Sequence, residues 1–170
     1  VLWGLTLFHA IRGDLRVFET LAEQLLAQAN ETAIPANLVA AHQMMASVNE
    51  FLGHTVRSNE HADQALALHR PDQHLSFISR FGLDPGMIVR ALSPRPLWFL
   101  GYPDQAAQRS AESLALAHEL SHPYSLARVL VDAAYLHGFC REWSRLQERA
   151  EALRDLAAAH GFAEMYARAT

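Results

Sequence analysis

The sequence predicts an all-α protein in which antiparallel helix pairs stack into a right-handed curved solenoid. Almost every stretch has the 3.6-residue periodicity of helices, and the alternating β-branched runs that are typical of strands are absent. The residues that dominate the composition, Ala, Leu, Glu, Gln and Arg, favour helices. A turn motif also recurs along the chain at a nearly fixed interval, which is typical of stacked helical repeats.

Four turns carry this repeat, and they are centred on Gly13, Gly53, Gly101 and Arg141. They lie 40, 48 and 40 residues apart. Each follows a helix that ends in bulky apolar residues and precedes a helix with small residues on one face. Glycine suits the left-handed backbone conformation that ends many helices, and Arg141 departs from this pattern. Each unit is therefore predicted to be two helices joined by a tight turn.

The breaks between periodic stretches delimit the helices in order. They come at Gly13, 30–35, Gly53, 70–85, 101–103, 121–123, Arg141 and Gly161. Helices are predicted over residues 1–12, 14–30, 36–52, 55–69, 86–100, 103–120, 123–140, 142–160 and from 162 onward. Segment 70–85 is rich in Pro, Asp and Gly, so we expect a loop or a short turn of helix there. Ser93-Pro94-Arg95-Pro96 should kink or break the next helix, and Asp84 should cap it.

We expect one domain over residues 1–170, with about four helix pairs and an irregular insertion at 70–85. A chain of 170 residues can bury a sizeable core. It begins at Val1, within a predicted helix and without a methionine, which indicates a fragment of a longer polypeptide. The end helices would then lack their natural neighbours, and their apolar faces could pair two copies as a homodimer.

The composition restricts the classes of function. Hydrophobic residues make up 51% and charged residues 19% of the chain, as in ordered soluble proteins. The net charge of −4 disfavours nucleic-acid binding. No apolar run approaches the length of a membrane-spanning helix, and no signal peptide is visible. The single cysteine, Cys140, fits a reducing cytoplasm and is expected to be a buried structural thiol.

Several stretches carry a family resemblance. The pattern Gly-x-x-x-x-Ala, followed seven positions later by a small residue, resembles the second half of the tetratricopeptide motif and is clearest at Gly101, Ala106 and Ser113. The longer stretches are LWGLTLFHAIRGDL at 2–15, ISRFGLDPG at 78–86, LWFLGYPDQA at 97–106 and ELSHPYSLA at 119–127. Together they resemble the C-terminal tetratricopeptide-like region of large bacterial signalling ATPases.

In that family a nucleotide-cyclase-like or winged-helix DNA-binding domain comes first, followed by a P-loop ATPase. The resemblance implies a regulatory or partner-binding module for this segment, and it carries over no catalytic residue. Solenoids of this type bind partners on a concave face, which is lined mainly by the first helix of each pair. Counting back from the turns gives the candidate groove residues Gln43, Ser47, Glu50, Arg90, Arg95, Trp98, Val131 and Tyr135.

Trp98 is the expected anchor of this groove, because aromatic residues often dominate the energetics of interfaces. Its alternative role is to fill space between helices. The expected partner is a protein, a peptide or the upstream domains of the same polypeptide.

The stretch His118-Glu119-Leu120-Ser121-His122 matches the signature of zinc peptidases, whose two imidazoles lie on one helical face. Pro123 disfavours helical geometry at His122, so the two rings should not share a face. No other histidine has a spacing that supplies a third ligand. Ser121 is instead expected to cap the next helix. The sequence therefore predicts no metal site, no cofactor and no catalytic residue.

The first hypothesis for function is a non-catalytic interaction and regulatory module of a cytoplasmic bacterial signal-transduction ATPase or transcriptional regulator. Two alternatives belong to other classes. In one, the groove or segment 70–85 encloses a small-molecule effector, and Arg80 could pair with an anion there. In the other, a zinc metallohydrolase uses residues 118–122.

Overall fold

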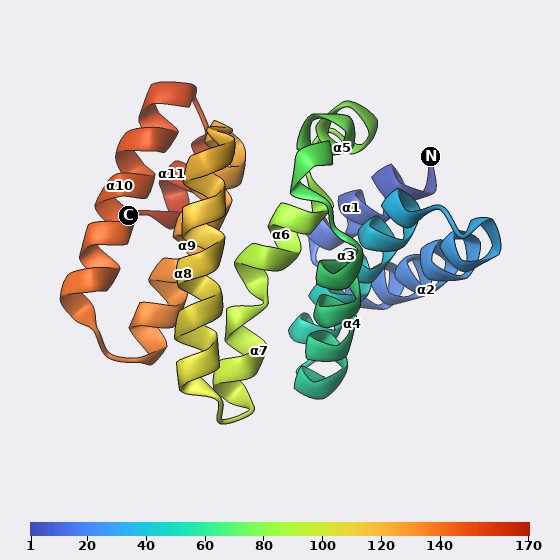
Figure 1. Cartoon of the computed structure of the whole chain (residues 1–170), viewed down its shortest axis with the longest axis horizontal. Coiled ribbons are helices and arrows are strands. Elements are labelled where there is room, and N and C mark those ends of the chain that lie inside the picture. Colours follow the sequence, from blue (N-terminus) through green and yellow to red (C-terminus); the bar gives the residue numbers. More distant parts are fainter. The chain divides into compact units, whose positions relative to one another are not determined.

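The computed structural model describes residues 1–170, and its regular elements are all helices (Figure 1). The prediction of an all-α protein is confirmed. Backbone contacts divide the chain into two compact units, Val1–Val89 (unit 1) and Arg90–Thr170 (unit 2), with the boundary inside α6 (Pro85–Leu92). None of the helices combines the length and the apolar character that crossing a membrane requires.

In unit 1 the first four helices each pack against their neighbour in the sequence. Its elements before α6 are α1 (Leu2–Arg12), α2 (Leu15–Thr32), α3 (Pro35–Phe51), α4 (Thr55–Leu68), the 3-10 turn η1 (Pro71–Gln73) and α5 (His74–Phe81). Phe18 and Ala22 of α2 pack with Met44 and Val48 of α3 in a fully buried cluster. The alanine lets the two helices approach closely, while the larger side chains remove apolar surface from water.

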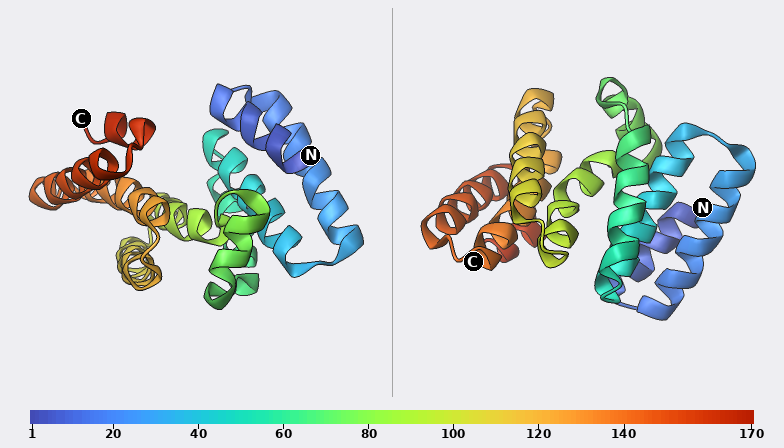
Figure 2. Two further views of the ribbon diagram at one scale, coloured as in Figure 1. Left: turned by 90° about the horizontal axis from the view of Figure 1, so that it is seen from above. Right: turned by 60° about the horizontal axis from the view of Figure 1, so that its bottom comes forward.

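Unit 2 follows the same order of packing. After the end of α6 it contains α7 (Pro94–Phe99), α8 (Pro103–Leu120), α9 (Pro123–Phe139), α10 (Trp143–His160) and α11 (Ala163–Arg168). Helix α9, drawn in orange, contacts both α7 and α11 (Figure 2). Leu130, Leu153 and Met165 bring α9, α10 and α11 together in a buried cluster.

Proline and glycine set most helix bounds within a few residues of the prediction. Pro35, Pro103 and Pro123 occupy the first helical turn, where a missing N–H costs nothing. The break expected at residues 93–96 is confirmed, because α6 ends at Leu92 and α7 begins at Pro94. Segment 70–85 is more regular than a loop, since it contains η1 and the eight-residue α5, whose Phe77 is buried.

The four repeat turns share one backbone conformation. The φ angles are 75° at Gly13, 78° at Gly53, 89° at Gly101 and 58° at Arg141. The prediction that Arg141 marks a fourth copy of the turn is therefore confirmed. Side chains disfavour this left-handed region, so Arg141 is held there by the helices on either side. The neighbouring Cys140 is exposed, and the expectation of a buried thiol was wrong because this residue ends α9 at a surface turn.

We expect Arg141→Gly to raise the free energy of unfolding by up to about 1 kcal/mol, because it relieves the left-handed arginine. Urea denaturation followed by circular dichroism at a helical wavelength measures the change. The matched control is Arg145→Gly, which removes an exposed arginine from the first turn of α10 and should lower the free energy of unfolding by up to about 1 kcal/mol. An equal loss of stability in both variants would contradict the prediction.

Candidate functional site

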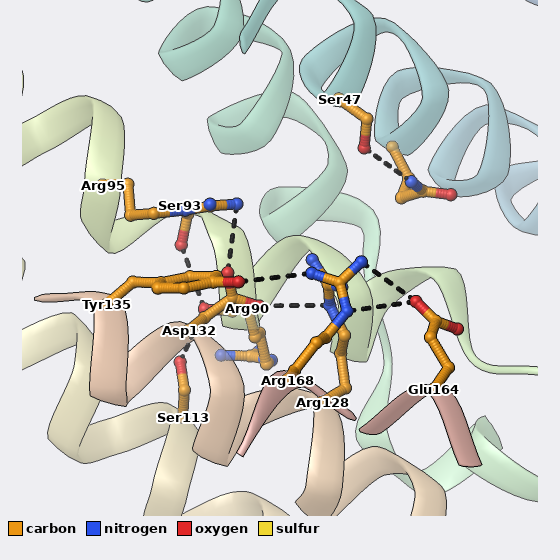
Figure 3. Close-up of polar contacts among 11 residues, drawn as sticks. Ser47, Arg90, Ser93, Arg95, Ser113, Arg128, Asp132, Tyr135, Glu164 and Arg168 are labelled. Carbon is orange, nitrogen blue, oxygen red and sulfur yellow. Dashed lines mark hydrogen bonds and ion pairs between the residues drawn. The ribbon is translucent and has the colours of Figure 1, made fainter. Parts of the chain in front are cut away.

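A cluster of charged side chains in unit 2 comes from α7, α9 and α11. Arg128, Asp132 and Tyr135 follow one another at i, i+4 and i+7, so they share one face of α9. Arg95 comes from α7 and Arg168 from α11 (Figure 3). We call these five residues the arginine face.

Asp132 organises this face. Its side chain is 1% exposed, with Oδ1 3.0 Å from Arg95 Nη2 and Oδ2 3.1 Å from Arg128 Nε. The two arginine side chains are 17% and 19% exposed, so part of each guanidinium remains at the surface. A buried carboxylate is stable only beside compensating positive charge, so Arg95 and Arg128 both pair with Asp132. The two guanidinium groups are therefore held beside each other.

Tyr135 and Arg168 extend the arginine face. The guanidinium carbon of Arg95 lies 5.6 Å from the centroid of the Tyr135 ring, and Arg168 Nη1 donates to Tyr135 Oη at 3.3 Å. Arg168 also donates from Nε and Nη2 to Glu164 Oε1, at 3.1 and 2.9 Å. Burial opposes the charge of Arg168, but the hydrogen bonds to Glu164 and Tyr135 outweigh it and raise its pKa. The guanidinium is therefore charged at neutral pH.

The charge balance suits an anionic partner. Three guanidinium groups, from Arg95, Arg128 and Arg168, face the two carboxylates of Asp132 and Glu164. The planar guanidinium fork matches carboxylate groups, and the exposed ring of Tyr135 offers an apolar surface beside it. The arrangement can bind acidic groups.

The structure brings two of the predicted groove residues, Arg95 and Tyr135, into this site. The backbone carbonyl of Arg90 accepts hydrogen bonds from the hydroxyls of Ser93 and Ser113, at 3.3 and 2.9 Å. Val131 is a core residue with 2% exposure, and its placement in the groove was wrong. The prediction was displaced by one residue along α9. The face that carries the charges passes through residues 128, 132 and 135, and Val131 lies beside it.

Trp98 is partly buried in an aromatic cluster of unit 2. Its ring stacks on Phe139 with centroids 5.2 Å apart and meets Phe99 edge-on at 5.3 Å. The more exposed members are Phe99 at 56% and Phe139 at 38%. This packing favours the space-filling role of Trp98, while its role as an interaction anchor stays a prediction.

The remaining predicted groove residues lie on α3 of unit 1. Gln43 is buried, and its Nε2 donates to Ser47 Oγ at 2.9 Å (Figure 3). Glu50 follows one turn later and is partly buried. Gln43, Ser47 and Glu50 share one helical face through their i, i+4, i+7 spacing.

The zinc-peptidase signature is divided between two helices. His118 and Glu119 belong to the last turn of α8, which ends at Leu120. Ser121 ends α8 with a φ of 50°, so its expected role as the cap of the next helix was wrong. His122 has that role, because its Nδ1 accepts a hydrogen bond from the Ser125 N–H at 3.3 Å. No group of three or more His, Cys, Asp or Glu side chains is arranged to hold a metal ion.

No family model and no curated protein matches the sequence. Among solved structures, the chain is similar to the crystal structure of BtubC (BKLC) from P. vanneervenii, with a TM-score of 0.63 and 18% identity. The match covers 91% of this chain and 60% of that one, so the chain spans about 60% of the length of its structural neighbour. At this level of identity the similarity concerns the fold alone.

Proposed function

We propose that this chain is a non-catalytic, tetratricopeptide-like interaction module whose helix pairs continue as a right-handed solenoid. Three features support the proposal: the four left-handed turns, the packing of successive helices from α1 to α4 and from α7 to α11, and the similarity to another helical structure. The module would regulate a cytoplasmic bacterial signalling ATPase or transcriptional regulator, by binding a protein, a peptide or the upstream domains of its own polypeptide.

The arginine face is the proposed contact surface, and the observation that carries it is the buried Asp132 between Arg95 and Arg128. A carboxylate in this position fixes both guanidinium groups before any partner arrives, which reduces the entropy lost on binding. The excess of positive charge then selects an acidic segment. Tyr135 adds an exposed aromatic surface of the kind that is enriched at interfaces.

Dye-labelled degenerate peptides test this proposal by fluorescence anisotropy. One set carries Asp or Glu at alternate positions, and the matched set carries Asn or Gln there. We expect the protein to prefer the acidic set, and we expect Arg128→Gln and Arg168→Gln each to weaken that binding by about tenfold. Added salt should weaken it further, because it screens exposed charges.

The control variant is Arg145→Gln on α10, which removes an exposed arginine outside the arginine face. It should leave binding unchanged. Arg128→Gln removes a partner of the buried Asp132 and so also disturbs the fold. Arg168→Gln avoids this effect, because Arg168 pairs with Glu164 instead. Equal binding of the two peptide sets, or unaltered binding by the folded Arg168→Gln variant, would refute the proposed contact surface.

A further inference from the structure

Unit 1 contains a cavity of about 470 Å³ that the proposed interaction surface does not use. Its walls come from α1, α2, the start of α3 and the end of α5. The lining residues used below are Trp3, Gly4, Ala29, Asn37, Arg80 and Phe81. The volume lies within the range of pockets that hold small organic ligands.

Aromatic side chains form one wall of this cavity. The rings of Trp3 and Phe81 meet edge-on with centroids 5.2 Å apart. Trp3 Nε1 donates to the Phe81 carbonyl oxygen at 3.2 Å, which fixes the orientation of the indole. Two small side chains, those of Ala29 and Ala40, also line the cavity. The wall is thus apolar, and its own polar atom is already satisfied.

Arg80 is the only lining residue with a charged side chain. Its Nη2 donates to Asn37 Oδ1 at 2.7 Å, and its guanidinium carbon lies 5.5 Å from the centroid of the Phe81 ring. These two contacts orient the guanidinium and leave further N–H groups to donate, because an arginine has five. A planar fork of donors beside an aromatic wall suits a carboxylate.

Gly4 is the smallest residue in the cavity lining. Glycine is among the least favoured residues within a helix, yet it lies in the first turn of α1. Its φ is not left-handed, and a Cβ added there would meet no atom within 4 Å. Neither backbone conformation nor packing therefore requires a glycine at this position. A side chain can therefore be introduced at this exposed position of the cavity lining as a test.

We propose that this cavity binds a small amphipathic carboxylate. The apolar part of the ligand lies against Trp3, Phe81 and the two alanines, and its carboxylate pairs with Arg80. Such a ligand would connect α1, α2, α3 and α5, and its binding would stabilise unit 1 by mass action. This site is separate from the arginine face and does not depend on the function proposed for it.

Isothermal titration calorimetry and thermal unfolding test this site with octanoate and 3-phenylpropionate as probes, one aliphatic and one aromatic. The neutral control ligand is octanamide. We expect at least one carboxylate to bind and to raise the melting temperature. Arg80→Gln should weaken that binding by about tenfold and leave the weaker binding of octanamide unchanged.

Gly4→Leu is the decisive variant, because Gly4 lines the cavity and a Cβ there would meet no atom within 4 Å. It should abolish binding while the melting temperature of the free protein stays the same or rises. Arg16→Gln, which removes an exposed arginine of α2 outside the cavity lining, should have no effect. Three results would overturn the proposal: failure of both carboxylates to bind at millimolar concentration, unaltered binding by Gly4→Leu, or equal affinity for octanoate and octanamide.

Discussion

Replacing Asp84 by alanine is expected to lower the free energy of unfolding of unit 1 by about 3–5 kcal/mol. The side chain is completely buried and accepts from four donors. Oδ1 accepts from the N–H groups of Gly86 and Met87, at 2.8 and 3.3 Å, which confirms the predicted cap of α6. Oδ2 accepts from His69 Nε2 at 3.2 Å and from His74 Nδ1 at 2.6 Å.

These contacts make one carboxylate the junction of three helix ends: His69 ends α4, His74 begins α5, and Asp84 precedes α6. Burial raises the pKa of Asp84, but the hydrogen bonds and charges of His69 and His74 outweigh it, and the pKa lies below its ordinary value. Because the ionised carboxylate can only accept, His69 must carry a proton on Nε2 and His74 one on Nδ1. In the alanine variant these buried donors lose their acceptor.

The matched control for Asp84→Ala is Asp72→Ala in the same segment. Asp72 is 66% exposed and pairs with the equally exposed Arg70, so its loss should cost at most about 1 kcal/mol. Urea denaturation measures both variants, and hydrogen exchange in residues 69–92 localises the effect. If the two variants lose the same stability, the buried junction contributes little to the fold.

Gly86 provides a second way to disturb the junction, because a Cβ there would overlap the ring of His69. The clash is with a buried and hydrogen-bonded imidazole, which has no free space to move into. Gly86→Ala should therefore be destabilising in the same direction as Asp84→Ala. The double variant should lose less free energy of unfolding than the sum of the two single losses, since both substitutions act on one cluster.

Mild acid is expected to destabilise unit 1 by up to about 3 kcal/mol through His42 of α3. This side chain is largely buried, and its Nδ1 lies 3.0 Å from Nδ1 of His61 on α4. One ring must donate to the other, so the pair cannot carry two protons at these nitrogens. Burial first, and the charge of His61 second, lower the pKa of His42 to about 4 from its ordinary 6.5.

Acid lowers the stability because the unfolded state binds this proton at a higher pH than the folded state. The unfolded chain takes up a proton at His42 near pH 6.5, whereas the folded chain does so only near pH 4. The contribution to stability is thus complete above pH 6.5 and is lost as the pH falls from 6.5 to about 4. Burial lowers the pKa of His61 too; Glu60 opposes this change, and Arg57 adds to it.

The measurement compares the free energy of unfolding of the protein and of His42→Gln between pH 7 and pH 4. Glutamine can still hydrogen-bond to His61 but does not titrate, so the variant should show a shallower loss. His54→Gln, at an exposed position, is the control and should follow the unmodified protein. Asp84 also stabilises the fold in a pH-dependent way, but at lower pH. Because its pKa is lowered in the folded chain, its contribution to the free energy of unfolding is present above pH 3.8 and is lost below that pH. Parallel pH curves for the protein and His42→Gln would contradict the prediction.

The sequence predicted the helices well because their ends depend on local chemistry. Pro103 and Pro123 begin helices, and Gly53 ends the turn that follows one, whatever the rest of the chain does. Helix α5 was the exception. It has only eight residues between Gln73 and Gly82, too few for a clear periodicity, and its buried His74 depends on a carboxylate ten residues away.

The candidate site was only partly predictable, for a physical reason. Tyr135 and Arg95 were placed by counting from the turns, but Asp132, the partner of Arg95, is identified only by the packing between α7 and α9. The spacing of Arg128, Asp132 and Tyr135 was a signal in the sequence that could have revealed one charged face of α9. The link from Arg168 to Tyr135 spans 33 residues, and no local pattern encodes it.

The junction at Asp84 also bears on how such a chain can change during evolution. The interval between turns grows from 40 to 48 residues where η1 and α5 occur, and α5 itself has eight residues. Because Asp84 and His69 join the two ends of this segment, it closes on itself. Such a closed segment is one way in which a helical chain can accept an insertion between its turns, and protein engineers could exchange its exposed residues while they keep His69, His74 and Asp84.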